Sequence, residues 1–181
     1  MGLVFEAGIC SVLIHSTDGN EEVETTMNRD VEAKRNRYGR IEVQLADLFL
    51  KTKNPVARMA TAAALIHAKV GGLLWTGWYL LDGEDLLVGP YQGPVACLVL
   101  TRHTGVCWAS IDRGETVIVP DVHAFPGHIA CDSRSRSEIV VPLRDKAGSL
   151  TGVLDIDSAK PAHFDTNDGE MLERIVGMIH R

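Results

Sequence analysis

Cysteines and acids are the residues of this 181-residue chain whose types and spacing could do chemistry. The stretch from residue 89 to residue 158 holds three of the four cysteines and three acidic residues in or next to apolar runs: Cys97, Cys107, Cys131, Glu138, Asp155 and Asp157. A thiolate can act as a nucleophile or a metal ligand. A carboxyl group can donate or accept a proton in a reaction. We therefore expect this stretch to carry the function, with the rest of the chain as its scaffold.

The cysteines are ten and twenty-four residues apart, and none forms a C-x-x-C pair. This spacing excludes a zinc knuckle and a thioredoxin-type motif. A single cysteine is most often a small buried hydrophobe. Cys107 and Cys131, however, stand in segments dense in Gly, Pro, His and Ser, which favour loops, and functional thiols are often carried by loops. We interpret Cys10 as an incidental thiol.

Histidines lie close to two of these cysteines in sequence. His103 precedes Cys107 by four residues, and His123 and His128 lie within nine residues of Cys131. A metal site or a Cys–His nucleophilic pair could be drawn from them. Neither spacing matches a standard ligand pattern, and the H-x-E and P-C-x-x-C pieces of zinc deaminases are absent. No metal is expected.

The acids allow two interpretations. Asp155 and Asp157 are one strand period apart, so their side chains share a face, and Glu138 opens another apolar strand. They are either exposed acids at strand ends or a cluster that binds a cation such as a substrate ammonium, because a buried unpaired carboxylate is costly. Trp75 and Tyr79 belong either to the core or to the wall of a small-ligand pocket.

Hydrophobic periodicity places these residues in an α+β domain. Residues 41–49 and 56–67 predict helices separated by the break at Asn54-Pro55, and a last helix is capped by Asp165 or Thr166. Between them, apolar runs bounded by turns predict strands at residues 73–81, 86–88, 95–100, 116–119, 139–143 and 150–156. We expect a central antiparallel sheet flanked by N- and C-terminal helices, spanning residues 41–181. Residues 1–40 predict an N-terminal extension: residues 1–16 alternate weakly and could form a strand or a loose apolar tether, whereas residues 17–40 are polar and predict a mobile or partly helical segment.

Composition excludes several classes of partner. The net charge of −6 offers no basic surface for a nucleic acid. No window approaches the roughly 20 apolar residues of a membrane span. The N-terminus lacks the pattern of a signal peptide or a myristoylation site, so the cytoplasm is the expected compartment, where the cysteines are reduced thiols.

Several segments closely resemble the free methionine-R-sulfoxide reductases, which are single-domain GAF enzymes: residues 89–97, 105–107, 120–123, 126–133, 137–143 and 152–158. The likeness covers roughly residues 41–181. It implies a GAF-like fold and reduction of free L-methionine-R-sulfoxide to L-methionine, with thioredoxin as the external reductant and no bound cofactor. GAF domains of this kind often pair through helices, so the resemblance allows a homodimer, although the sequence does not determine the oligomeric state.

The resemblance also implies roles for individual residues. Cys131 resembles the nucleophile that becomes a sulfenic acid, and Cys97 resembles the thiol that then forms a disulfide with it. Cys107 matches a third, auxiliary cysteine of the family. The remaining matches hold the substrate ammonium, assist protonation of the sulfoxide oxygen or form the aromatic pocket: Glu138, Asp155, Asp157, Trp75 and Tyr79.

The chain departs from the family at Trp108, where glycine is usual, and at residues 102–104. Two other hypotheses stay open. One is a GAF sensor module that binds a small molecule such as a cyclic nucleotide without chemistry, because a fold does not fix a function. The weaker one is a metal-dependent hydrolase that uses His123, His128 and Cys131.

Overall fold

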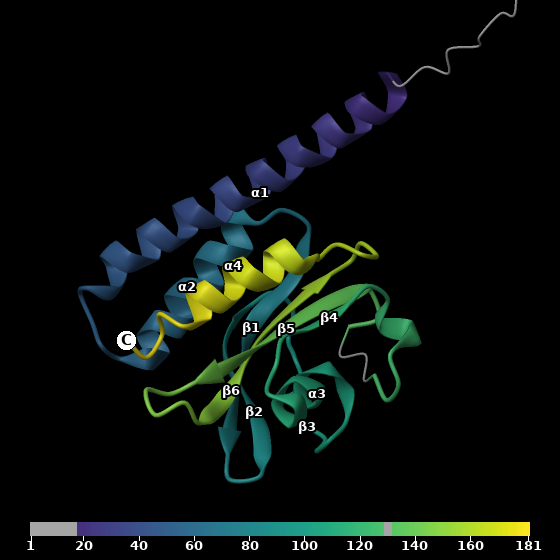
Figure 1. Cartoon of the computed structure of the whole chain (residues 1–181). Coiled ribbons are helices and arrows are strands. Elements are labelled where there is room, and N and C mark those ends of the chain that lie inside the picture. Colours follow the sequence, from purple (N-terminus) through teal and green to yellow (C-terminus); the bar gives the residue numbers. More distant parts are fainter. Residues whose placement is uncertain (1–17, 129–131) are drawn as a thin grey trace, which may run out of the picture.

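The computed structural model describes residues 18–128 and 132–181, so the predictions for residues 1–17, Cys10 and Cys131 concern residues outside the described ranges. Figure 1 shows an antiparallel sheet with helices on both faces. The elements follow one another as α1 (Asp18–Phe49), α2 (Pro55–Lys69), β1 (Leu73–Asp82), β2 (Asp85–Gln92), β3 (Val99–Leu100), α3 (Gly105–Arg113), β4 (Val117–Val119), a 3-10 turn (Val122–Ala124), β5 (Ser137–Arg144), β6 (Leu150–Ser158) and α4 (Thr166–Val176).

The six strands lie in the order β3-β2-β1-β6-β5-β4, and every neighbouring pair is antiparallel. Two hairpins, β1–β2 and β5–β6, are joined at the centre by the pairing of β1 with β6. Short turns make each hairpin, as the Asp82-Gly83 and Lys146-Ala147-Gly148 sequences predicted. The predicted α+β fold, with an antiparallel sheet flanked by N- and C-terminal helices, is confirmed.

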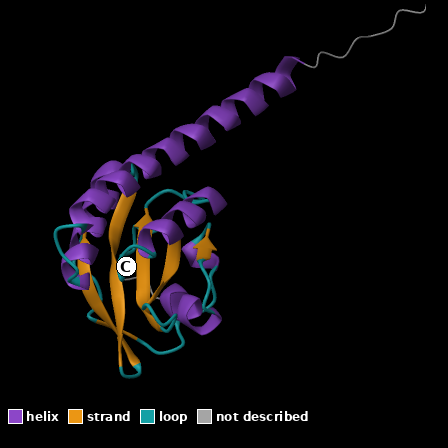
Figure 2. Ribbon diagram, turned by 60° about the vertical axis from the view of Figure 1, so that its left-hand side comes forward, coloured by secondary structure: helices purple, strands orange, loops and turns teal. Residues whose placement is uncertain are grey.

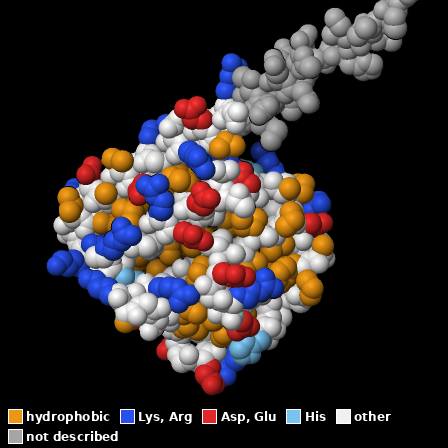
Figure 3. Space-filling view, in the orientation of Figure 1, with side chains coloured by type: hydrophobic (Ala, Val, Ile, Leu, Met, Phe, Trp, Pro, Cys, Tyr) orange, Lys and Arg blue, Asp and Glu red, His pale blue; other side chains and the backbone are white. Residues whose placement is uncertain are grey.

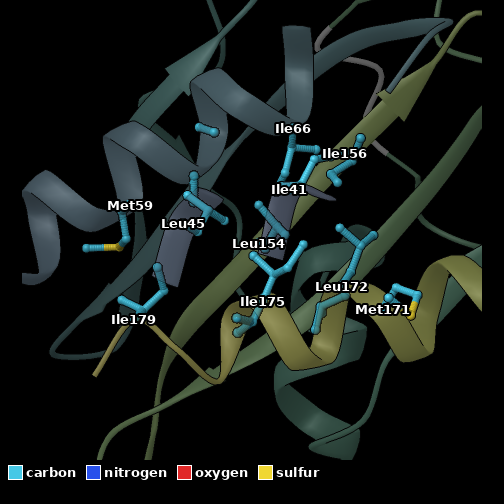
Figure 4. Packing of buried hydrophobic residues seen from close by; sticks show 14 of the residues in the cluster. Ile41, Leu45, Met59, Ile66, Leu154, Ile156, Met171, Leu172, Ile175 and Ile179 are labelled. Atoms are coloured by element: carbon cyan, nitrogen blue, oxygen red, sulfur yellow. The ribbon is translucent and has the colours of Figure 1, made fainter. Parts of the chain in front are cut away.

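One face of the sheet packs against α1, α2 and α4, which lie together in Figures 1 and 2. Figure 4 shows this core, in which aliphatic side chains of the three helices meet those of β6. Leu154 and Ile156 alternate along β6 with Asp155 and Asp157, so the same strand supplies core residues to one face and acids to the other. The short helix α3 packs against β5, β6 and β4 on the acid-bearing face.

Helix α1 is longer than the sheet it covers and projects beyond it in Figure 1. The boundary predicted between residues 40 and 41 falls inside this helix. Tyr38, on the N-terminal side of that boundary, is only 1% exposed and belongs to the core. The division of the chain into an N-terminal extension (residues 1–40) and a GAF-like domain (residues 41–181) stays a prediction. Within the described residues, no helix is long and apolar enough to cross a membrane.

Arg58 of α2 ties three chain segments together. Asn54 caps α2 by accepting a hydrogen bond from Ala57 N, and Pro55 occupies its first turn. The Arg58 guanidinium, 6% exposed as a residue, donates to the carbonyl oxygens of Thr52, Phe49, Met178, Ile179 and Arg181 at 2.6–3.2 Å. The guanidinium therefore satisfies helix-end carbonyls that would otherwise lack partners.

Charged side chains of both signs are interspersed on the face seen in Figure 3, with apolar side chains between them. No side of this view is covered by cations alone. This mixture is consistent with the acidic net charge of −6.

Two local predictions were wrong. The segment predicted as a strand over residues 95–100 pairs with β2 only at Val99 and Leu100. Cys107, predicted to lie on a loop, lies in helix α3, which begins at Gly105 and ends before Gly114 in the left-handed conformation (φ 67°). The helix is nine residues long, too short for its periodicity to outweigh the Gly, Thr and His that precede it.

Candidate active site

The site is built on the three central strands. On the face opposite the α1–α2–α4 core, Trp75 of β1, Asp157 of β6 and Glu138 of β5 stand side by side in the register. The next row of the same face places Gly77 beside Asp155. The predicted sharing of one face by Asp155 and Asp157 follows from the strand period. Three strands therefore bring the acids and one aromatic ring together.

Three aromatic rings line up beside the acids. The Trp75 ring stacks with Tyr79 at a centroid distance of 5.6 Å and with Tyr91 at 5.3 Å. A Cβ atom at Gly77 would come within 2.4 Å of both the Trp75 and the Tyr91 side chains, so the glycine makes room for the stack. Tyr79 also donates a hydrogen bond from its hydroxyl to the carbonyl oxygen of Cys97 at 3.1 Å.

A cavity opens between this face of the sheet and the loops that follow β2 and precede β5. Its lining includes Trp75, Tyr79, Cys107, Glu138, Asp155 and Asp157, six of the eight predicted site residues. Cys97 is half-buried in the loop between β2 and β3 and is not part of the lining. Cys131, the predicted nucleophile, lies outside the described residues, but His128 and Asp132 on either side of it line the cavity.

Burial and mutual repulsion dominate the electrostatics of the acids. Glu138 is 5% exposed and Asp155 6% exposed. Burial first, and then the negative charges of Asp155 and Asp157, raise the pKa of Glu138 well above its ordinary value. Burial and Asp157 do the same to the pKa of Asp155, and burial raises that of Asp157 to about 6. Burial and mutual repulsion therefore both favour the protonated form of these carboxyl groups.

Cys107 contacts this cluster from α3. Its residue is 4% exposed, and burial raises the pKa of its thiol, with the Asp155, Glu138 and Asp157 carboxylates adding to the shift. The thiol also shares a hydrogen bond with the Asp155 carboxyl. Because only the thiolate is a strong nucleophile, Cys107 is poorly suited to be the attacking thiol in this environment.

Sequence reasoning missed Ser135, whose hydroxyl donates a hydrogen bond to Asp157 Oδ1. The bond lowers the pKa of Asp157 against the larger effect of burial. Asp132 was missed as well; it pairs with the Arg134 guanidinium, which holds its pKa at about 2. Both lie in the turn-rich approach to β5, where Ser135 belongs to no periodic pattern or motif. Asp132 lies in the segment 126–133 that carries the resemblance, next to Cys131, and this position was the signal that could have found it.

Only one of the histidines singled out from the sequence lines this cavity. His128 Nδ1 lies 3.8 Å from Glu138 Oε2, and burial, followed by the charge of His123, lowers the pKa of His128. His123 is exposed, and His103 pairs with Asp112 on the surface. Among the described residues, the one group of three ligand-type side chains close enough to hold a metal contains no histidine: Cys107, Glu138 and Asp155.

The fold has close counterparts among known proteins. A sequence profile of the GAF domain matches residues 2–180. The free methionine-R-sulfoxide reductase of Escherichia coli (strain K12) is 39% identical over 126 residues, which is 70% of this chain and 76% of that protein. The chain belongs to this family of GAF-domain proteins.

Solved structures agree with that placement. A free methionine-R-sulfoxide reductase from Neisseria meningitidis, in complex with its substrate, superposes with a TM-score of 0.77 at 39% identity, over 81% of this chain and 88% of that one. Relatives with less specific names match equally well. The GAF domain-containing protein A of Dictyostelium discoideum is 40% identical over 148 residues, 81% of this chain and 92% of that protein.

Proposed function

We propose that this protein is an oxidoreductase that reduces free L-methionine-R-sulfoxide to L-methionine. The proposal rests on the buried carboxyl groups of Glu138, Asp155 and Asp157, which line the same cavity as the stacked rings of Trp75 and Tyr79. Among residues 18–128 and 132–181, no Lys or Arg forms an ion pair with Glu138, Asp155 or Asp157. The family membership and the substrate complex of the Neisseria relative support the same substrate class.

The cluster fits a free amino acid better than a peptide. A substrate ammonium would supply the positive charge that the carboxyls lack, and its three N–H groups would each find an acceptor. A methionine inside a peptide has no free ammonium, so it would leave the carboxyls without that charge. The stacked rings of Trp75 and Tyr79 offer an apolar wall for the thioether side chain.

The reaction that we propose needs one protonated carboxyl. A sulfoxide sulfur is a poor electrophile until its oxygen is protonated or hydrogen-bonded. The raised pKa values of Glu138 and Asp155 keep a proton available for that oxygen at neutral pH. A thiolate then attacks the sulfur and forms a bond between the two sulfur atoms, and the protonated sulfoxide oxygen leaves as water. A water molecule next attacks the cysteine sulfur and breaks the sulfur–sulfur bond, so that methionine leaves and the cysteine becomes a sulfenic acid.

The resemblance assigns that attack to Cys131, and the protonated state of Cys107 supports the choice against Cys107. Cys97, half-buried in the loop between β2 and β3, would then attack the sulfenic sulfur with its thiol, giving a Cys97–Cys131 disulfide and one water molecule. Thioredoxin would return both thiols by dithiol exchange. We assign Cys107 an auxiliary part. The cycle needs no bound cofactor.

Thioredoxin-coupled NADPH oxidation with the separate R and S epimers of free methionine sulfoxide tests the proposal. We expect turnover of the R epimer only, and turnover of neither epimer would overturn it. Cys131→Ser should abolish reduction even in a single turnover. Cys97→Ser should retain the first reduction and block recycling, and the opposite pattern would exchange the two roles.

The sensor hypothesis makes a different prediction at the same cavity. A cyclic nucleotide carries a phosphate anion, which the Glu138, Asp155 and Asp157 carboxylates would repel. Isothermal titration of the reduced protein with cyclic AMP and with L-methionine separates the two. Binding of the nucleotide without any reductase activity would favour a sensor.

A further inference from the structure

The carboxyl cluster is joined by a sulfur atom, which gives it a second ligand chemistry. The Cys107 Sγ and one carboxylate oxygen each of Glu138 and Asp155 all lie within 4.8 Å of one another. These three side chains come from α3, β5 and β6, so rigid elements hold them in place. All three residues are more than nine-tenths buried. We infer that this set is a binding site for a thiophilic divalent cation of the Zn²⁺ type.

An unsatisfied atom points to the same conclusion. Asp155 Oδ1 is buried and has no hydrogen-bond partner among the described residues, although Asp155 lines the cavity. A buried carboxylate oxygen without a partner costs free energy, so a native structure normally supplies one. The Asp155 oxygen is therefore available to a cation that enters the cavity.

The ligand types select the ion. One thiolate and two carboxylates form a mixed soft and hard set, which suits Zn²⁺ and its spectroscopic substitutes Co²⁺ and Cd²⁺ better than Mg²⁺ or Ca²⁺, which prefer six or more oxygens. Zinc forms bonds of about 2.3 Å to sulfur and about 2.1 Å to oxygen, so a tetrahedral ion holds its ligand atoms about 3.5 Å apart. The ligand atoms, which lie within 4.8 Å of one another, would need to approach by about 1.3 Å at most to reach that separation.

The ion and the amino-acid substrate would exclude each other. Both would occupy the space beside the Glu138 and Asp155 carboxyl groups, and both enter the same cavity. The metal would thus act as a reversible block of the proposed reductase, and this half of the inference rests on the proposed function. Metal binding itself does not depend on it.

The test is a titration of the reduced, metal-free full chain with Co²⁺ alone, followed by its absorption spectrum. We expect one equivalent of Co²⁺ to produce thiolate-to-cobalt charge-transfer absorption, which Zn²⁺ then removes by displacement. Absence of this absorption at stoichiometric Co²⁺ would overturn the site.

Variants assign the ligands. Cys107→Ser should remove the charge-transfer absorption, whereas Cys97→Ser should retain it; the reverse result would place the metal elsewhere. Asp155→Asn should weaken Co²⁺ binding by at least about tenfold, because a charged ligand is lost. Asp132→Asn is the matched control, since Asp132 lines the same cavity but is already paired with Arg134, and its Co²⁺ affinity should stay within about twofold. If Asp155→Asn and Asp132→Asn weaken Co²⁺ binding equally, the loss reflects only the net charge of the cavity, and Asp155 is not a ligand.

Competition tests the exclusion separately. Free L-methionine, which has the ammonium but no sulfoxide oxygen, should raise the apparent dissociation constant of Co²⁺ in proportion to its concentration. Unchanged Co²⁺ affinity at saturating L-methionine would disprove the shared site. A protein that binds Co²⁺ at Cys107 but reduces neither sulfoxide epimer would retain the metal site and refute the reductase.

Discussion

Two groups of acids lie on opposite sides of the sheet, and only one of them is neutralised. At the start of α4, Asp165 and Asp168 share the Lys34 ammonium of α1 at 2.8 Å and 2.6 Å, and Tyr38 donates a further hydrogen bond to Asp168. In the cavity, Glu138, Asp155 and Asp157 have no such cation among the residues described. The first group fastens a helix. The second is left open for a positively charged ligand.

The difference shows how the same residue type serves stability in one place and binding in another. The Asp168 side chain is 4% exposed but has an ammonium and a hydroxyl as partners, so its charge is compensated within the fold. The cavity acids remain uncompensated, which costs folding free energy until a ligand binds. Disrupting the charge pairing of Asp165 and Asp168 should therefore lower stability. Neutralising a cavity acid should instead lower activity without lowering stability.

The largest effect is expected from Glu138→Gln. The amide keeps the shape of the side chain but cannot donate a carboxylic proton, so kcat/KM for the R-sulfoxide should fall by about 10²-fold or more. The stability of the fold should not fall, because a buried ionisable group is removed. Steady-state kinetics and urea unfolding of the same preparation measure the two quantities. Undiminished activity would remove Glu138 from the reaction.

Lys34→Met should act on stability alone. The substitution removes the Lys34 ammonium and leaves the buried Asp168 carboxylate beside Asp165 without a cation. Because Lys34 itself is half-buried, we expect a loss of about 2 kcal/mol in the free energy of unfolding. For a chain of this size that corresponds to a fall of about 4–8 °C in Tm. Arg35→Met, which removes an exposed pair with Glu170, is the matched control and should change Tm by under about 2 °C. Equal losses in the two variants would contradict a special role for Lys34.

Asp157→Asn should change the pH dependence of stability. Burial raises the pKa of Asp157 to about 6, above its ordinary value, so the folded state binds this proton more tightly than the unfolded state does. The corresponding stability is present below about pH 4 and is lost as the pH rises through about 6. The variant should therefore gain stability over the natural protein by on the order of 1–2 kcal/mol at pH 7.5 and by little at pH 4.5. Urea unfolding at both pH values checks the sign, and an equal gain at both would exclude titration of Asp157 as the cause.

Asp165→Ala should give the smallest of these effects. The Asp165 side chain caps α4 by accepting hydrogen bonds from Asn167 N and Asp168 N, and loss of a cap costs about 1 kcal/mol. Asp165→Asn keeps an acceptor for those amides and isolates the pairing with Lys34. If the Asn variant is as unstable as the Ala variant, the ion pair outweighs the cap. Thermal unfolding by circular dichroism compares them.

The sequence predicted the parts of this comparison that depend on local period. The face shared by Asp155 and Asp157, the two hairpins, the break at Pro55 and the cap at Asp165 each follow from residues close together in the chain. The opposition of Glu138 and Asp157 across two strands depends on register, which the sequence alone does not specify. The resemblance to a known family supplied that grouping instead.

Other parts depend on distant contacts and could not be predicted locally. Lys34 lies 131 residues from Asp165 along the chain, so the fastening of α1 to α4 has no local signal. Helix α3 is too short to reveal its period, and the position of Cys107 against the acids follows from that helix. The hydroxyl of Ser135 likewise meets Asp157 only through the approach of two chain segments.

The strand order has a consequence for how the chain is made. The centre of the sheet is the pairing of β1 with β6, and β6 is synthesised after most of the chain has left the ribosome. Until then the β1–β2 hairpin has no partner along its long edge, and an unpaired edge can associate with other chains. Assembly of the sheet, and with it the row of Trp75, Asp157 and Glu138, must wait for a contact between distant segments, which slows folding. The three acids meet within the β5–β6 hairpin, so the long-range contact that the site waits for is the one that places Trp75 beside Asp157.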